Sequence, residues 1–238
     1  MTGDIRAAII GLVGFAAAEE QMLLATCAVY EAGDPARWAA VPLVAHNTEF
    51  KLQQVHRLEA ITLGRAPSEF AEIDHSSDEV YGRYAAQPAD QVAAESCRVS
   101  GDLVRSLSLI EDADLTDPAR HAWLRGRQLW LQVIVRGFWH PTGHIAEYYL
   151  RHGQPDRAMA LQSHALATAR YLGAPDAARG MAAYGLACAQ AQAGRADEAA
   201  GTLATAVALN PDLRVNACRD PDLSALRENG TLAKILAR

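Results

Sequence analysis

Apolar residues recur along the chain at intervals of three and four, the spacing that places them on one face of an α-helix. This periodicity predicts four long helices, at residues 4–31, 35–63, 88–110 and 123–152. The sequence contains no run of alternating β-branched and polar residues between turn signals, so we expect no strand. Four long helices with one long central connection indicate an all-α protein built on an up-down four-helix bundle.

Turn residues divide the pattern into two parts. Residues 65–86 form the long connection, and a loop of that length in a compact domain usually has a function or crosses over the bundle. The sequence Gly153-Gln154-Pro155-Asp156 then interrupts the helical pattern. We therefore predict a four-helix bundle over residues 1–153 and a separate helical region over residues 154–238.

The second region has the small-residue pattern of a tetratricopeptide repeat. That pattern is Gly194-Arg195-Ala196-Asp197-Glu198-Ala199-Ala200, followed by Ala206 and Asn210-Pro211. A weaker copy begins 41 residues earlier, at Gly153, and borrows the end of the fourth bundle helix as its first helix. We therefore expect short helical hairpins packed on the bundle. Since repeats of this kind commonly hold peptides, we also expect a protein partner or self-association through residues 154–238.

Charge and cysteine content narrow the class of protein. The 238-residue chain has a formal net charge of -6 and no basic stripe, which argues against nucleic acid as a partner. Its four cysteines are scattered and form no C-x-x-C pair, as is typical of reduced thiols in the cytoplasm. The apolar segment 7–18 lacks the net positive flank of a secretory signal, so we expect no signal peptide. We also expect no membrane span, because by this reading no apolar run is long enough to cross a bilayer. We expect a cytoplasmic protein that does not bind membranes.

Three histidines carry the candidate chemistry. The His140-x-x-x-His144 spacing places two imidazoles one turn apart on one helix face. His46 lies in an apolar stretch of an earlier helix, where an uncoordinated imidazole would be costly to bury. Three histidine ligands with one open position are typical of a catalytic Zn²⁺ site, and Ni²⁺ and Fe²⁺ are the alternatives. Pro141, inside the pair, is expected to kink the helix near Gly137.

Charged residues near these histidines are candidate catalytic groups. Glu49 lies one turn after His46, and Glu147 lies three residues after His144. Either carboxylate would orient a metal ligand or accept a proton; the alternative is that both are solvated surface acids. Arg136, one turn before the His-x-x-x-His pair, would hold an anionic group of the substrate or pair with an acid.

The segment Trp38-Ala39-Ala40-Val41-Pro42-Leu43-Val44-Ala45-His46 resembles the W-x-x-x-D-L-x-x-H signature of the DinB/YfiT-like metal-binding four-helix bundles. Pro42 stands where that family has aspartate. The resemblance covers residues 1–153 and includes the His140-x-x-x-His144 pair on the fourth helix. It implies a metal held by these three histidines. Relatives include mycothiol- and bacillithiol-dependent transferases and maleylpyruvate isomerase-like proteins, so the resemblance also implies a low-molecular-weight thiol as a candidate cofactor.

Two functions follow from these observations. The first is a metal-dependent enzyme, a thiol S-transferase or hydrolase, that acts on a small electrophilic substrate in detoxification or self-resistance. The second is a non-catalytic interaction or scaffold protein, with a structural metal in the bundle and a partner-binding helical tail. The sequence identifies neither the substrate nor the oligomeric state.

Overall fold

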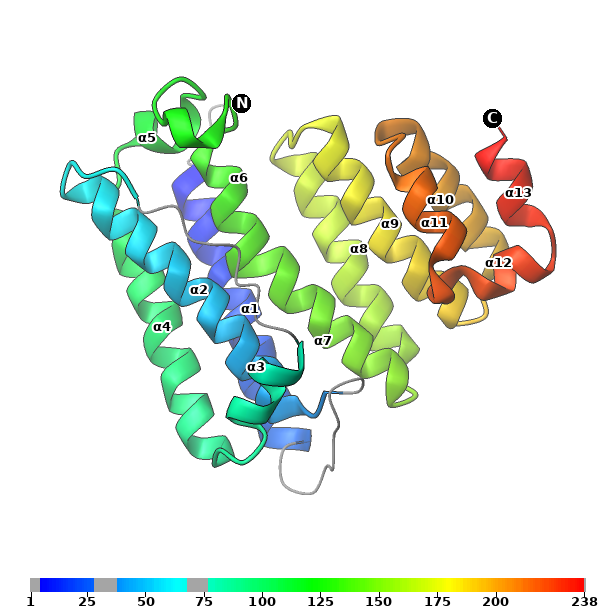
Figure 1. Cartoon of the computed structure of the whole chain (residues 1–238), viewed down its shortest axis with the longest axis horizontal. Helices are drawn as coiled ribbons and strands as arrows, with labels where there is room; N and C mark the ends of the chain where they lie inside the picture. Colours follow the sequence, from blue (N-terminus) through cyan, green and yellow to red (C-terminus); the bar gives the residue numbers. More distant parts are fainter. Residues whose placement is uncertain (1–4, 28–37, 68–76, 238) are drawn as a thin grey trace. The chain divides into compact units, whose positions relative to one another are not determined.

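The computed structural model describes residues 5–27, 38–67 and 77–237 (Figure 1). Every regular element within these ranges is helical, which confirms the all-α class. The predicted helix boundaries at residues 4, 31 and 35 lie outside the described residues, as does the middle of the long connection.

Contacts between Cα atoms divide the chain into two compact units, Met1–Pro141 and Thr142–Arg238. The boundary falls inside a helix, earlier in the chain than the predicted boundary after Gly153.

The first unit is formed mainly by α1, α2, α4 and the continuous segment α6–η2, which contact one another around a shared apolar core. Leu58, Leu103, Leu107 and Phe138 are among its fully buried side chains. The elements are α1 (Ile5–Cys27), α2 (Ala40–Thr62), α3 (Ser77–Tyr84), α4 (Ala89–Leu109), α5 (Asp112–Thr116), η1 (Ala122–Leu124), α6 (Leu129–Ile134) and η2 (Val135–Trp139).

The fourth long helix begins later than predicted, at Leu129 instead of at residue 123. Residues 122–124 form a 3₁₀ turn, and Arg125 and Gly126 follow it with φ values of 51° and 79°. Two successive residues in the left-handed region end any right-handed helix. The sequence periodicity of this segment therefore gave a helix that was too long at its N-terminal end.

A fully buried ion pair links α1, α2 and α4. The ammonium nitrogen Nζ of Lys51 lies 2.5 Å from Oε2 of Glu20 and 2.9 Å from Oγ of Ser100. The hydroxyl of Ser96 donates to the same carboxylate oxygen of Glu20 at 2.7 Å. Buried charges are tolerated only when they are paired and hydrogen-bonded, and these serines add hydrogen bonds to the pair, although Oε1 of Glu20 is buried without a hydrogen-bond partner.

By length and composition, α1 meets the criterion for a membrane span over Ile5–Thr26, contrary to the sequence expectation. Core helices and signal sequences meet the same criterion, so this is weak evidence for a membrane span. Within the first unit α1 has a buried face with Ile9, Val13 and Leu23 fully buried, and it carries Glu20 of the ion pair into the core.

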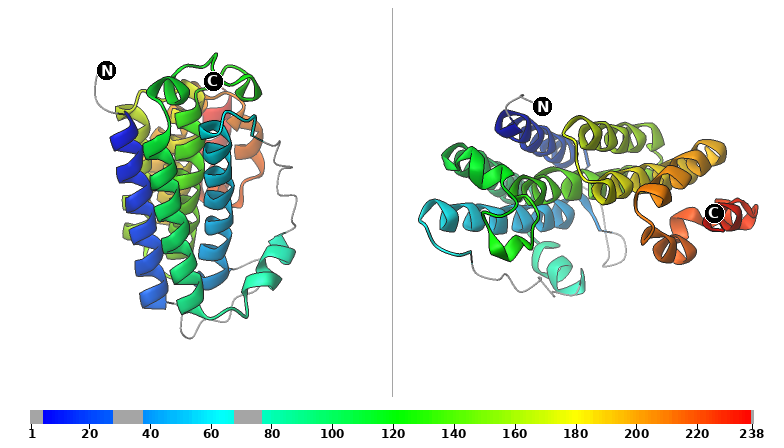
Figure 2. Two further views of the ribbon diagram at one scale, coloured as in Figure 1. Left: turned by 90° about the vertical axis from the view of Figure 1, so that its left-hand side faces the viewer. Right: turned by 90° about the horizontal axis from the view of Figure 1, so that it is seen from above.

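Successive helical hairpins form the second unit: α8 contacts α9, and α9 contacts α10 (Figure 2). Ala199 and Ala206, two small residues of the repeat pattern, are fully buried. At Gly180, a Cβ atom would lie 2.7 Å from Cβ of Asn210, so the α9 backbone approaches the end of α10 closely. The elements are the end of α7 (His140–Arg151), then α8 (Pro155–Tyr171), α9 (Asp176–Gln192), α10 (Ala196–Leu209), α11 (Leu213–Arg219), η3 (Pro221–Leu223), α12 (Ser224–Glu228) and α13 (Thr231–Leu236).

Candidate metal centre

A π-helical turn, η2, joins α6 to α7 immediately before the histidine pair. Pro141 has no N–H, and in a regular α-helix its ring would clash with the carbonyl of Gly137, four residues earlier. Gly137 is the middle residue of η2, so the helix widens where the clash would fall. Near Gly137, where a kink was expected, the helix has a π turn, a feature that is frequent at functional sites.

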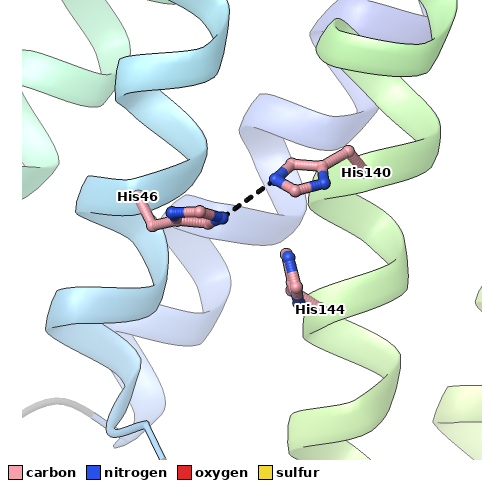
Figure 3. A group of neighbouring side chains, drawn as sticks. All are labelled: His46, His140 and His144. Atoms are coloured by element: carbon pink, nitrogen blue, oxygen red, sulfur yellow. Dashed lines mark hydrogen bonds between the residues drawn. The ribbon is translucent and has the colours of Figure 1, made fainter. Parts of the chain in front are cut away.

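Three histidines converge from two helices, His46 from α2 and His140 and His144 from α7 (Figure 3). Nε2 of His140 lies 3.1 Å from Nε2 of His46. One ligand atom from each of the three imidazoles lies within 4.8 Å of the other two. The unit boundary falls within α7, but His144 follows His140 by one turn of that continuous helix, which fixes the spacing between the two.

The distance between the imidazoles of His46 and His140 fits a shared metal ion. Two ring nitrogens that both present lone pairs at 3.1 Å repel each other unless a proton or a cation lies between them. Two nitrogens bound to one tetrahedral Zn²⁺ are about 3.3 Å apart, given Zn–N bonds of about 2.0–2.1 Å. The donor set of three imidazoles is also one that zinc commonly takes.

Aromatic side chains pack against two of the histidines. Trp38 meets His46 edge-on, with ring centroids 5.0 Å apart. Phe50 contacts both His46, at 4.7 Å, and His140, at 4.3 Å. The guanidinium of Arg136 lies over the ring of Phe50, 4.4 Å from its centroid. The rings restrict how the imidazoles can turn, and Phe50 is a site residue that the sequence analysis missed.

Glu147 lies beside the third histidine, as its spacing suggested. Its Oε2 is 3.2 Å from Nδ1 of His144. Burial raises the pKa of Glu147, but the hydrogen bond to His144 and the charges of His144 and Arg151 bring the pKa below its ordinary value. The hydrogen bond and the two positive charges together outweigh burial, so the net direction of the pKa is downward. Metal-bound histidines usually donate their second ring N–H to such a carboxylate.

Glu49 points to a different partner. Its Oε1 accepts hydrogen bonds from Arg83 and from the hydroxyl of Tyr84, both at 2.5 Å, so its contacts are with α3. Burial, followed by the hydrogen bond to Glu49, raises the pKa of Tyr84 to about 12. The sequence did not suggest this pairing, because Glu49 and Arg83 are far apart in the chain and meet only through the packing of α3 on α2.

Comparison of the chain with models of protein families, with curated proteins and with solved structures gave no match. Of the candidate residues, His46, His140, His144 and Glu147 lie together, whereas Glu49 is held by α3.

Proposed function

We propose that this protein is a metal-dependent enzyme that acts on a small electrophilic substrate by thiol transfer or hydrolysis. One observation carries the proposal: ligand atoms of His46, His140 and His144 lie within 4.8 Å of one another. Three imidazoles leave a coordination position for water, a thiol or substrate, which is the arrangement of catalytic zinc sites. Zn²⁺ is the metal we expect first, with Ni²⁺ and Fe²⁺ as alternatives.

We also propose that α1, α2, α4 and the α6–η2–α7 segment form an up-down bundle of the DinB/YfiT-like kind, spanning residues 1–153. The support is the order of the long helices and the place of the histidines on the second and the fourth of them. We assign residues 154–238 to a short tetratricopeptide-like extension. Its support is the succession of hairpins from α8 to α10 and the burial of small residues between them.

The chemistry divides between the metal and the side chains. His46, His140 and His144 would hold a divalent ion as neutral imidazoles, and the ion would lower the pKa of a bound water or thiol and so supply a nucleophile near neutral pH. Glu147 orients His144 by accepting a hydrogen bond from its Nδ1–H, and its carboxylate is placed to take up a proton released at the site. Phe50 and Trp38 exclude water from the histidine rings, and Arg136 holds an anionic group of the substrate.

Cobalt substitution tests this function, because cobalt gives a visible spectrum that is sensitive to coordination. The cobalt protein is titrated with cysteine-type thiols and with small anions at several pH values. We expect thiol binding to change the visible bands, to tighten as pH rises toward neutrality and to release a proton. At low pH the imidazoles take up protons and the site releases its metal.

The control is the His140→Ala variant, in which the same additions should leave the visible bands unchanged. Bands of the unmodified protein that respond neither to thiols nor to anions would mean a closed structural site. The enzyme hypothesis would then be rejected in favour of the second candidate function.

That second candidate is an interaction protein that uses residues 154–238. The observation in its favour is that Tyr171, Met181 and Val215, three large apolar side chains of the second unit, are each more than half exposed. Large exposed apolar groups often mark contact surfaces when they are contiguous. Sedimentation of the full chain over a range of concentrations tests self-association: a constant monomer mass would exclude it.

A further inference from the structure

A second group of metal-binding side chains lies within the second unit, apart from the histidines. Cys188 is on α9, and Asp220 and Asp222 flank Pro221 at the start of η3. The thiol sulfur and one oxygen from each carboxylate lie within 4.8 Å of one another. The three residues come from two segments more than 30 residues apart, so the fold and not local sequence brings them together.

The carboxylate of Asp220 is held in place from both of its oxygens. The hydroxyl of Tyr184 donates to Oδ2 at 2.7 Å, and the thiol of Cys188 approaches the same oxygen at 3.8 Å. The amide of Asp222 donates to Oδ1 at 3.0 Å. Tyr184 and Cys188, one turn apart on α9, are 9% and 7% exposed, so the group has a buried wall.

Among the described residues, no positively charged side chain forms an ion pair with the carboxylates of this group. The carboxylate of Asp222 receives no hydrogen bond there, and it faces the charges of Asp220 and Glu147. Burial and these two charges raise the pKa of Asp222. Burial, followed by the charges of the two aspartates, raises the pKa of the Cys188 thiol. The guanidinium of Arg227 donates to the backbone carbonyl of Asp220, at 2.8 Å, and not to a carboxylate.

We propose that Cys188, Asp220 and Asp222 bind a second divalent transition metal of the Zn²⁺ class, with Tyr184 as the residue that positions Asp220. Zinc accepts both thiolate and carboxylate, at about 2.3 Å and about 2.0–2.2 Å, whereas Ca²⁺ and Mg²⁺ take oxygen ligands only. On binding, the S–H bond of Cys188 breaks, its proton goes to solvent and a sulfur–metal bond forms. The metal then fastens the segment that begins at η3 to α9.

Sulfur makes this site distinguishable from the histidine site. A thiolate bound to Co²⁺ gives a charge-transfer band in the near ultraviolet, and the histidine site contains no sulfur. The full-length, metal-free protein is titrated with Co²⁺ beyond one equivalent. We expect the charge-transfer band in the unmodified protein, its loss in Cys188→Ser and its retention in the matched control Cys97→Ser, which removes an exposed thiol of the first unit.

Two further variants test the oxygen side of the site. Asp222→Asn keeps the size of the side chain and removes the charge, so the Co²⁺ dissociation constant measured from this band should rise at least about 10-fold. Tyr184→Phe should raise it roughly 10- to 100-fold, the usual effect of removing a group that orients a ligand. Far-ultraviolet circular dichroism checks that each variant is folded. If Cys188→Ser does not fold, the Co²⁺ dissociation constant of Asp222→Asn tests the proposal instead.

The proposals for the histidine site and for the Cys188 site can be tested independently. His140→Ala should keep the charge-transfer band even though it loses the histidine-bound ion. The proposal is overturned if the unmodified protein has no charge-transfer band, if the band persists in Cys188→Ser, or if Asp222→Asn binds Co²⁺ as tightly as the unmodified protein.

Discussion

The backbone amide of His140 donates its hydrogen bond to the carbonyl oxygen of Val135, five residues earlier in the chain. A regular α-helix joins each amide to the carbonyl four residues earlier. The difference means that the helix carrying two of the candidate ligands has one wider turn directly before the first of them. The direction of the His140 ring toward His46 therefore depends on η2 (Figure 3).

Replacing Gly137 in this turn should destabilise the protein. A Cβ atom there would lie 3.0 Å from Cγ2 of Val13 and 3.3 Å from Cδ2 of Leu103, so neighbouring core side chains must shift. We expect Gly137→Ala to lower the free energy of unfolding by about 1–3 kcal/mol, measured by urea denaturation. Gly101→Ala is the control: a Cβ atom meets nothing within 4 Å there, and the change should stabilise by up to about 1 kcal/mol. Equal effects of the two changes would contradict the tight fit of η2.

Metal content should depend on the three histidines and not on others. His140→Ala and His144→Ala should each hold one equivalent of divalent ion less than the unmodified protein, because two remaining imidazoles bind weakly. His56→Ala and His164→Ala should keep the full amount. The measurement is elemental analysis of protein prepared without a histidine tag. The same metal content in all four variants would rule out the three-histidine site.

Removing one partner of the buried ion pair should lower the free energy of unfolding more than removing both partners. Lys51→Met leaves the carboxylate of Glu20 buried without its cation, and we expect a loss of about 3–5 kcal/mol in the free energy of unfolding. The double change Lys51→Met with Glu20→Leu leaves no buried charge and should recover most of that loss. Chemical denaturation measures both. If the double variant is no more stable than the single one, the pair has a different role from the one its burial indicates.

Stability of the metal-free protein should fall as pH rises through the range in which Asp222 titrates. Burial, followed by the charges of Asp220 and Glu147, raises the pKa of this carboxyl from 3.8 to about 6. The folded state therefore holds the proton more tightly than the unfolded chain, and stability is lost between about pH 4 and about pH 6. We expect about 1–2 kcal/mol, less than the full value for such a shift because the side chain is only partly buried.

Asp222→Asn should remove this part of the pH dependence and should be the more stable protein at neutral pH. Thermal denaturation of both proteins with a chelator present, at about pH 4 and about pH 7, gives the comparison. If the change in stability between these two pH values is the same in both proteins, Asp222 does not titrate in this way.

Sequence reasoning succeeded where the information was local. The spacing of His140 and His144 already places them on one face, and the closeness of Glu147 to His144 follows from the same helix. It failed where two distant segments had to meet. The partners of Glu49 come from α3, and no pattern around Lys51 marks a lysine that is fully buried by an acid on another helix.

The Cys188 group illustrates the same limit. In the sequence Cys188 is one of four scattered cysteines with no C-x-x-C pair. Asp220 and Asp222 lie beyond the repeat pattern, which ends at Asn210-Pro211. Only the packing of η3 on α9 brings the sulfur and the carboxylates within reach of one another.

The π turn also limits how this sequence can change over evolution. A π turn is an α-helix with one residue added, so deleting any single residue from Val135–Trp139 would remove that extra residue and return the helix to its ordinary register. Each residue accounts for about 100° of helix rotation, so the deletion would swing one side of the helix relative to the other. Either the buried positions before it or His140 and His144 after it would then face the wrong way. Descendants of this chain can therefore exchange residues in this stretch much more readily than they can gain or lose one.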